Sequence, residues 1–67
     1  MKALNSFHEP LLSIGTILLY KKVKVEIVDY DGWHDGFADY YVIQPVDESA
    51  YYIRIVRYND ENLEEIK

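Results

Sequence analysis

The clearest regularity in the chain is a strict alternation of apolar and charged residues over 22–27. Successive side chains of a strand point to opposite faces, so the alternation places Val23, Val25 and Ile27 on one side of an extended segment. A helix would scatter the same residues around its circumference. The pattern therefore predicts a β-strand whose apolar face is turned toward a core. The opposite, solvated face holds Lys22, Lys24 and Glu26.

Three further segments have the composition of strands. Residues 16–20 form a short apolar run that predicts a strand before the alternating one, and 38–44 predict a strand after it. Pro45 has no N–H to donate, so this third strand ends there or lies at a sheet edge. Residues 51–58 predict a fourth strand. One of its faces holds Tyr51, Ile53 and Ile55, and the other, which we expect to point outward, holds Tyr52, Arg54, Val56 and Tyr58.

The register between the third and fourth strands stays open, because both strands carry apolar residues on both faces. A hairpin loop over 47–49 joins them. One pairing sets Val42 beside Ile53, and a slip of one residue sets Ile43 there instead. Either pairing fills a core, so the sequence does not choose between them.

The two ends of the chain differ in pattern from the middle. Residues 1–13 are irregular, and the spacing of Ser6 and Glu9 matches a capping box. We expect an arm or a single helical turn there, with Phe7, Leu11 and Leu12 docked on the body. Residues 59–66 predict a short helix or a single 3₁₀ turn, since Asn59 or Asp60 can cap it. In that helix Leu63 and Ile66 would close one mouth of the sheet.

This layout resembles that of the SH3-like small barrels. A glycine, Gly15, precedes the first apolar strand, and an alternating strand, an irregular aromatic loop and two more strands follow. The ending over 60–64 places a leucine in a turn after the last long strand, as those barrels do. The resemblance covers about 15–66 and implies a partly open antiparallel barrel of four or five strands that binds ligands against its loops. A four-stranded meander with a helix is the alternative. In either case residues 14–67 form one mostly-β domain.

Composition and charge narrow the class of protein. The chain has 67 residues, 49% of them hydrophobic, with no cysteine, so it forms one domain without disulfides or thiolate metal sites. Its longest apolar run, 17–20, is far too short to cross a bilayer, and we expect a soluble, cytoplasmic protein. Twelve acids against seven Lys and Arg give a net charge of −5. That charge disfavours phosphate-tracking binding to nucleic acid and favours a basic partner.

Residues 29–39, called the acidic segment below, concentrate the candidate chemistry. They hold four acids, three aromatics and one of the two histidines, with Asp-Gly turns at 31–32 and 35–36. A calcium loop beginning at Asp29 fails, because Trp33, His34 and Tyr40 stand where a polar ligand, a glycine and a glutamate are required. A looser site on His34 lacks a full ligand set, so we expect no metal and no cofactor.

An interaction surface is the more persuasive reading of the acidic segment. Trp, Tyr and Phe are enriched at interface hot spots, and Asp pairs with Arg or Lys across an interface. Whether Trp33 and Phe37 are exposed or fold inward over the core stays open. The partner-binding residues that we expect are Tyr30, Asp31, Trp33, His34, Asp35, Phe37 and Asp39.

A second candidate surface lies on the fourth strand. Tyr52, Arg54 and Tyr58 interleave aromatic and cationic side chains like a base-stacking platform, which Arg57 and the lysines of 21–24 could extend. Cross-strand Tyr and Arg pairs also stabilise an exposed sheet without any ligand, and the rest of the chain is acidic. These observations disfavour nucleic acid as a partner.

These observations predict a binding protein and not an enzyme. The chain has no cysteine nucleophile, phosphate-binding glycine loop or metalloprotease motif, and it has little volume to enclose a substrate. We expect a non-enzymatic protein-binding module, a small acidic inhibitor or adaptor that docks on a larger protein with a basic or nucleic-acid-binding surface. In size and charge it resembles the small acidic inhibitors that bacteriophages direct against host nucleases and defence proteins. A nucleic-acid-binding module and a structural subunit of a larger assembly are the alternatives, and the oligomeric state stays open.

Overall fold

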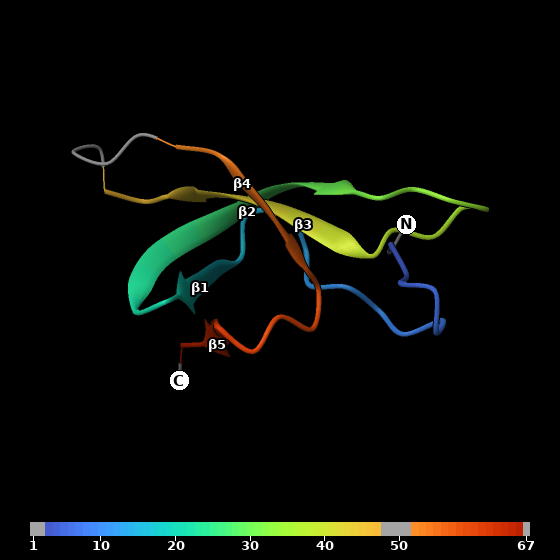
Figure 1. The fold of residues 1–67 in the computed structure, drawn as a ribbon, viewed down its shortest axis with the longest axis horizontal. Helices are drawn as coiled ribbons and strands as arrows, with labels where there is room; N and C mark the ends of the chain where they lie inside the picture. Colours follow the sequence, from blue (N-terminus) through green and yellow to red (C-terminus); the bar gives the residue numbers. More distant parts are fainter. Residues whose placement is uncertain (1–2, 48–51, 67) are drawn as a thin grey trace.

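The chain folds into one open, antiparallel, five-stranded sheet (Figure 1). The computed structural model describes residues 3–47 and 52–66, and no helix occurs among them. The strand order across the sheet is β4-β3-β2-β1-β5, so β4 and β5 are the edges. This architecture confirms the mostly-β prediction. The strands are β1 (Ile17–Tyr20), β2 (Val23–Asp31), β3 (Tyr40–Pro45), β4 (Arg54–Arg57) and β5 (Leu63–Glu65).

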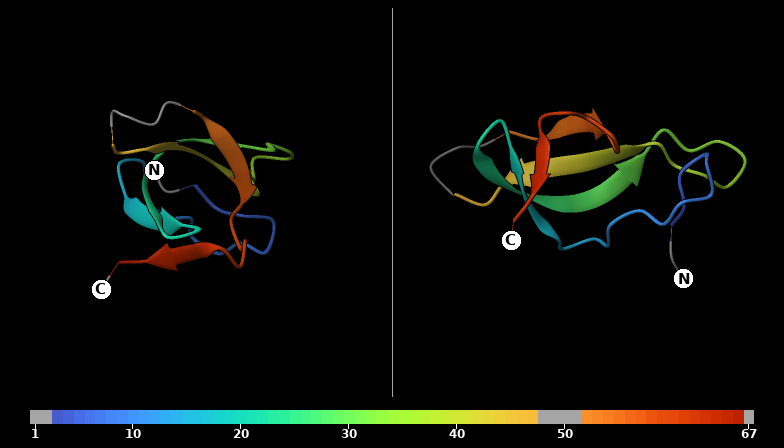
Figure 2. Two further views of the ribbon diagram at one scale, coloured as in Figure 1. Left: turned by 60° about the vertical axis from the view of Figure 1, so that its left-hand side comes forward. Right: turned by 90° about the horizontal axis from the view of Figure 1, so that it is seen from below.

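Strand β2 is the longest element and it curves the sheet. Val25 and Ile27 are fully buried, as the alternation predicts, whereas Val23 at the start of the strand is exposed. The strand continues four residues beyond its predicted end, past a bulge in which the register shifts between Ile27 and Asp29. A bulge inserts one residue into a strand and increases its twist. Figure 2 shows β2 and β3 bent together along their length.

A tight turn of two lysines joins β1 to β2. Tyr20 pairs with Val23, so Lys21 and Lys22 alone make the connection. Their φ angles are 50° and 70°, in the left-handed region that a two-residue hairpin requires. Lysine is uncommon there, and the absence of Gly or Asn left this turn without a sequence signal.

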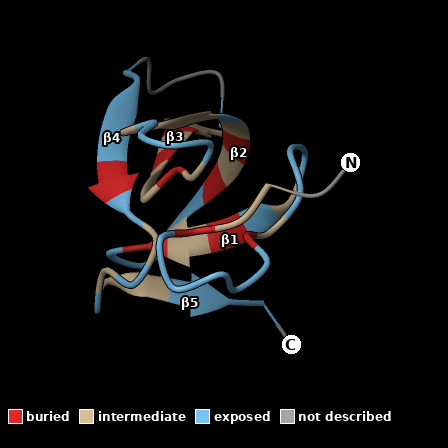
Figure 3. Ribbon diagram, turned by 90° about the vertical axis from the view of Figure 1, so that its right-hand side faces the viewer, coloured by how far each residue is buried: buried red, intermediate tan, exposed pale blue. Residues whose placement is uncertain are grey.

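The face of β4 is the reverse of the predicted one. Val56 is buried opposite Tyr41, while Ile53 and Ile55 are 67% and 54% exposed. Figure 3 shows β4 mostly exposed with one buried segment. Neither predicted register holds, because Val42 pairs with Ile55.

A hydrogen bond beyond the end of β4 accounts for this register. The Tyr58 N–H donates to the Asp39 carbonyl at 3.0 Å and continues the pairing of Val56 with Tyr41. That pairing turns even-numbered residues inward. The sequence pattern had predicted residues 51, 53 and 55 on the inward face because all three are apolar. Of these, Tyr51 lies outside the described residues.

Strand β5 replaces the predicted C-terminal helix. The Asp60 carboxylate accepts from the Asn62 N–H at 2.8 Å, and the Asp60 carbonyl accepts from the Leu63 N–H at 3.0 Å. Asp60 thus closes a turn instead of capping a helix. The chain then pairs with β1, where Leu63 lies opposite Tyr20, and satisfies a backbone edge that a helix would have left open. Leu63 packs on the core, but Ile66 is exposed and closes no mouth.

The N-terminal arm is a closed loop and not a helical turn. Buried Asn5, instead of Ser6, organises it, since the Asn5 amide oxygen accepts from the N–H groups of Phe7 at 2.8 Å and Glu9 at 3.1 Å. The Ser6 N–H is directed away, to Asp39. Among the residues predicted to dock, Leu11 is buried and Leu12 packs on the core, but Phe7 is exposed. The Phe7 prediction is therefore wrong.

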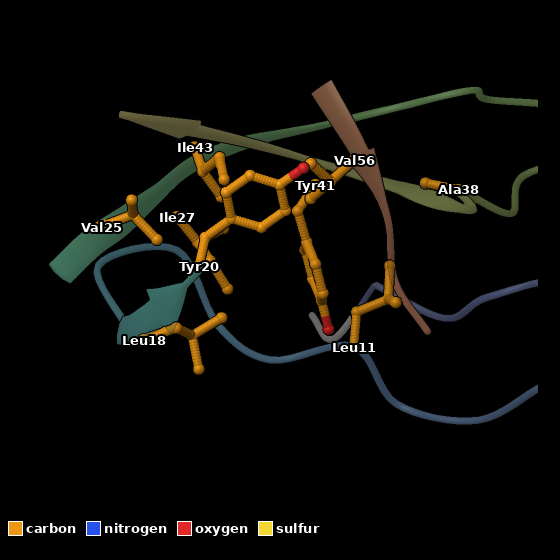
Figure 4. Close-up of a cluster of buried hydrophobic side chains, with 9 residues drawn as sticks. All are labelled: Leu11, Leu18, Tyr20, Val25, Ile27, Ala38, Tyr41, Ile43 and Val56. Atoms are coloured by element: carbon orange, nitrogen blue, oxygen red, sulfur yellow. The ribbon is translucent and has the colours of Figure 1, made fainter. Parts of the chain in front are cut away.

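Two tyrosine hydroxyls fasten this arm to the concave face of the sheet. The Tyr30 hydroxyl donates to the Leu12 carbonyl at 2.7 Å, and the Tyr41 hydroxyl accepts from the Leu12 N–H at 2.9 Å. Tyr30 and Tyr41 are themselves paired across β2 and β3. Burial raises the pKa of Tyr41, which is inside the core (Figure 4). The core consists of Leu11, Leu18, Tyr20, Val25, Ile27, Ala38, Tyr41, Ile43 and Val56.

Candidate functional site

The acidic segment is built as a projecting hairpin. Strand β2 supplies its first three residues, and the chain returns at β3 (Figure 1). His34 and Phe37 exchange two backbone hydrogen bonds of 2.8 Å, and Asp35 and Gly36 between them have φ angles of 51° and 85°. Positive φ at both central residues is typical of a type I′ turn, for which Asp-Gly is a preferred sequence. The predicted turn at 35–36 is therefore confirmed.

Gly32 provides a second fixed point in this hairpin. Its φ is 71°, and a Cβ built on it would collide with the ring of Tyr40. Only glycine fits this combination of backbone angle and close ring approach. The Asp31 carboxylate accepts from the Gly32 N–H at 2.7 Å and holds the bend from the other side.

The aromatic side chains of the segment divide between exposed and packed positions. Trp33 is 55% exposed, and its ring makes an edge-on contact with Tyr30, at 6.2 Å between ring centroids. Phe37 is half-buried against the ring of His8 from the N-terminal arm, at 4.8 Å. Of the two aromatics whose position the sequence left open, Trp33 therefore presents its indole to solvent.

Asp39 ties the hairpin to the arm. One of its carboxylate oxygens lies 2.9 Å from His34 Nε2, and the other accepts from the Ser6 N–H at 2.9 Å. The hydrogen bond from His34, followed by that from Ser6, lowers the pKa of Asp39 to about 2. His34 and Asp39 thus help to position the hairpin, and the side chain of His34 stays 53% exposed.

The remaining carboxylates of the segment carry uncompensated charge. Asp29 and Asp31 accept hydrogen bonds from the backbone of their next residues, and Asp35 is exposed at the tip. Among the described residues none of these three forms an ion pair. Within the same residues no group of three or more His, Cys, Asp or Glu is placed to hold a metal ion. The site therefore consists of an exposed indole flanked by carboxylates.

The second predicted surface lies on the core-facing side of β4, where Tyr52 and Arg54 nevertheless remain exposed. The guanidinium of Arg54 lies 5.6 Å from the ring centroids of both Tyr20 and Tyr52, on the concave side of the sheet. Tyr58 is half-buried against the core. The reversed face of β4 explains both positions, since even-numbered residues of this strand point inward.

Sequence reasoning missed two surfaces. The first is the outer face of β4, where Ile53 and Ile55 are exposed. Its orientation follows from the register with β3, which the hydrogen bond between Tyr58 and Asp39 sets, and no local sequence pattern indicates that bond. The second is an open cleft of about 320 Å³ between the arm and the last turn. Leu12, Leu18 and Leu63 form part of its apolar lining, and its carboxylates come from Asp60, Glu64 and Glu65.

In the part of the chain that the structure describes, no helix has the length and apolar character to span a membrane. In comparisons with known proteins, no family model, no curated protein and no solved structure matches the chain.

Proposed function

We propose that the protein is a non-enzymatic binding module that docks through its acidic hairpin on a basic surface of a larger protein. The observation that carries this proposal is the exposure of Trp33 on a hairpin whose backbone is fixed at both ends. A large side chain held outside the core of so small a domain forgoes burial that would stabilise the fold. Contact with a partner accounts for that loss.

The charge of the hairpin supports a basic partner. Residues 29–39 contain four acids and no Lys or Arg, in a chain whose net charge is −5. The lysines at 21, 22 and 24 lie at the opposite end of β2 (Figure 1). A one-sign patch of this kind accelerates association with an oppositely charged surface and orients the encounter. In the finer form of the proposal, the carboxylates of Asp31 and Asp35 occupy positions where a nuclease or similar enzyme receives phosphates, so the protein acts as an inhibitor.

The preformed backbone of the acidic hairpin also supports a role in binding. Asp39, Gly32 and the type I′ turn restrict the hairpin before any partner arrives, so little conformational entropy remains to be lost on docking. An aromatic anchor in a desolvated pocket contributes about 2 kcal/mol or more to affinity, or roughly thirtyfold in Kd. Trp33 has the geometry of such an anchor.

The test compares capture of proteins from a bacterial lysate by three folded versions of the chain. A protein captured by the wild type should be lost with Trp33→Ala/Asp35→Ala and should dissociate as salt rises. The matched control, Ile14→Ala/Glu61→Ala, changes an equally exposed apolar residue and an exposed acid elsewhere, and it should retain the protein. No captured protein, or capture that the hairpin variant leaves unchanged, would contradict the proposal.

Nucleic-acid binding is the second candidate, favoured by one observation. The exposed side chains of Lys21, Lys22 and Lys24 gather at the β1–β2 turn, away from the acidic hairpin. Binding there would be salt-dependent and weakened by Lys24→Ala or Arg54→Ala. Fluorescence anisotropy with a labelled oligonucleotide at low salt tests it, and no binding under those conditions would eliminate it.

A further inference from the structure

The outer edge of β4 combines two features that edge strands usually avoid. Ile53 and Ile55 are 67% and 54% exposed, and no described residue pairs with the side of β4 opposite β3. An apolar edge with unpaired N–H and C=O groups is a template for adding another strand. Natural edges are blunted by a proline, a bulge, charged residues or a short length. Strand β4 has no proline or bulge, but it is four residues long and carries Arg54 and Arg57.

The hydrogen-bond pattern identifies which backbone groups are available. In an antiparallel pair, alternate residues direct both their N–H and their C=O toward the same neighbour. The Tyr58 N–H bonds to Asp39 on the β3 side, so Val56 and Arg54 also face β3. Ile55 therefore directs its N–H and C=O to the free edge, as Arg57 does its N–H, whereas the Arg57 carbonyl accepts from the Asp60 N–H at 3.1 Å. The exposed side chain of Ile55 lies on the outer face of the same strand.

We propose that this edge pairs with β4 of a second copy of the chain, antiparallel and centred on Ile55. In that arrangement Ile55 faces Ile55 of the other copy as a hydrogen-bonded pair, and the two sheets join into one of ten strands. Arg54 lies opposite Val56 and Arg57 opposite Ile53, so no like charges are directly opposed. The interface is self-complementary, as a two-fold axis requires.

Size and exposed area support a second copy as the occupant. Chains this small usually require a disulfide, a metal or oligomerisation to supplement one core. This chain has no cysteine, and its described residues hold no metal cluster. Its accessible surface is 4852 Å². The scaling for monomers of 7.9 kDa gives about 4,400 Å². The surface is thus roughly 450 Å² larger than that of a typical monomer of this mass, which matches an interface smaller than the standard share of about 800 Å² per partner.

Arg54 does not oppose this pairing. Its guanidinium stacks over Tyr20 and Tyr52 on the concave side, away from the apolar outer face where Ile53 and Ile55 lie. Arg57 lies on the outer face over the ring of Tyr40, at 5.6 Å, and its aliphatic stem can cover Ile53 of the second copy.

Cysteine cross-linking tests the register directly. Residues in a hydrogen-bonded antiparallel pair have Cα atoms about 5.5 Å apart, within the range that a disulfide spans. Because the chain has no cysteine, Ile55→Cys should yield a single covalent dimer under mild oxidation. The control Ile14→Cys places the thiol outside β4 at a position that is 55% exposed, against 54% for Ile55, and should cross-link far less.

Sedimentation equilibrium over roughly a hundredfold range of protein concentration provides the second test. The wild type should dimerise, and Ile55→Pro should abolish dimerisation by removing the edge N–H while leaving the bonds to β3 intact. Ile55→Lys should also abolish it, and Ile14→Lys should not. Circular dichroism verifies that each variant is folded. A wild type that stays monomeric throughout, or a dimer that survives both folded β4 variants, would overturn the proposal, and neither result bears on the hairpin.

Discussion

A substitution in the lysine turn between β1 and β2 is expected to stabilise the fold, whereas most substitutions destabilise a protein. Lys22 has a φ of 70°, a conformation that costs a residue with a side chain about 1–2 kcal/mol and costs glycine almost nothing. Lys22→Gly removes this strain. It also forfeits about 0.5 kcal/mol through the greater flexibility of glycine in the unfolded chain.

The substitution also removes an ion pair, whose contribution is small. Lys22 Nζ lies 3.1 Å from a Glu64 carboxylate oxygen, but the side chains are 80% and 48% exposed. Pairs this exposed contribute about 0–0.5 kcal/mol. The net expectation is therefore a stabilisation of roughly 0–1.5 kcal/mol, and its midpoint of about 0.75 kcal/mol raises the Tm by about 3–6 °C in a domain of this size.

Lys24→Gly is the matched control, because it removes the same charge two residues away within regular strand β2. It should lower the free energy of unfolding by about 0.5–1 kcal/mol, since glycine weakens a strand. Urea denaturation of the three proteins measures both effects. If Lys22→Gly proved as destabilising as Lys24→Gly, strain at the turn would not be what governs its stability.

Three other predictions follow from single contacts. The pKa of Asp39, about 2, lies below the ordinary value of about 3.9, so its contribution to stability is complete above pH 4 and is lost as the pH falls toward 2. Asp39→Asn should flatten that part of an acid unfolding profile. Tyr41→Phe leaves the half-buried Leu12 N–H without its acceptor and should cost about 1–3 kcal/mol, measured by urea unfolding. Gly32→Ala, which combines positive φ with a ring collision, should destabilise more than Gly36→Ala, where a Cβ meets open space; thermal unfolding ranks the two.

The sequence predicted the elements whose signal is local. The alternation over 22–27 predicted that Val25 and Ile27 are buried, and the Asp35-Gly36 sequence predicted the turn of the hairpin. Both predictions were possible because a strand face and a tight turn depend on residues close together in the sequence. The face of β4 depends on the Tyr58–Asp39 hydrogen bond, which joins positions 19 residues apart, and no local pattern encodes it. The apolar content of that strand is similar on both faces, so periodicity alone could not assign the inner one.

The C-terminal prediction failed for a related reason. The capping signals over 59–62 are real, and Asp60 does accept a backbone hydrogen bond, but the same side chain serves a turn as readily as a helix start. What decides the outcome is the open edge of β1, which Leu63–Glu65 pairs and so satisfies. The edge of β1 is left unpaired only once the sheet has assembled, and β5 then pairs with it. Leu63 of β5 lies opposite Tyr20 of β1, 43 positions away in the sequence, so a local pattern could not reveal this pairing.

The two proposals concern different surfaces, and together they lead to a bivalent molecule. Strand β3 connects them, since Tyr40 follows the acidic hairpin and pairs with Arg57 of the β4 edge. An antiparallel pairing of two copies about Ile55 directs their hairpins in opposite senses along the joined sheet. A partner with two basic sites at that spacing would then gain avidity beyond the affinity of one hairpin. Ile55→Pro would remove only that gain, whereas Trp33→Ala would weaken each contact, so comparing the two variants separates affinity from avidity.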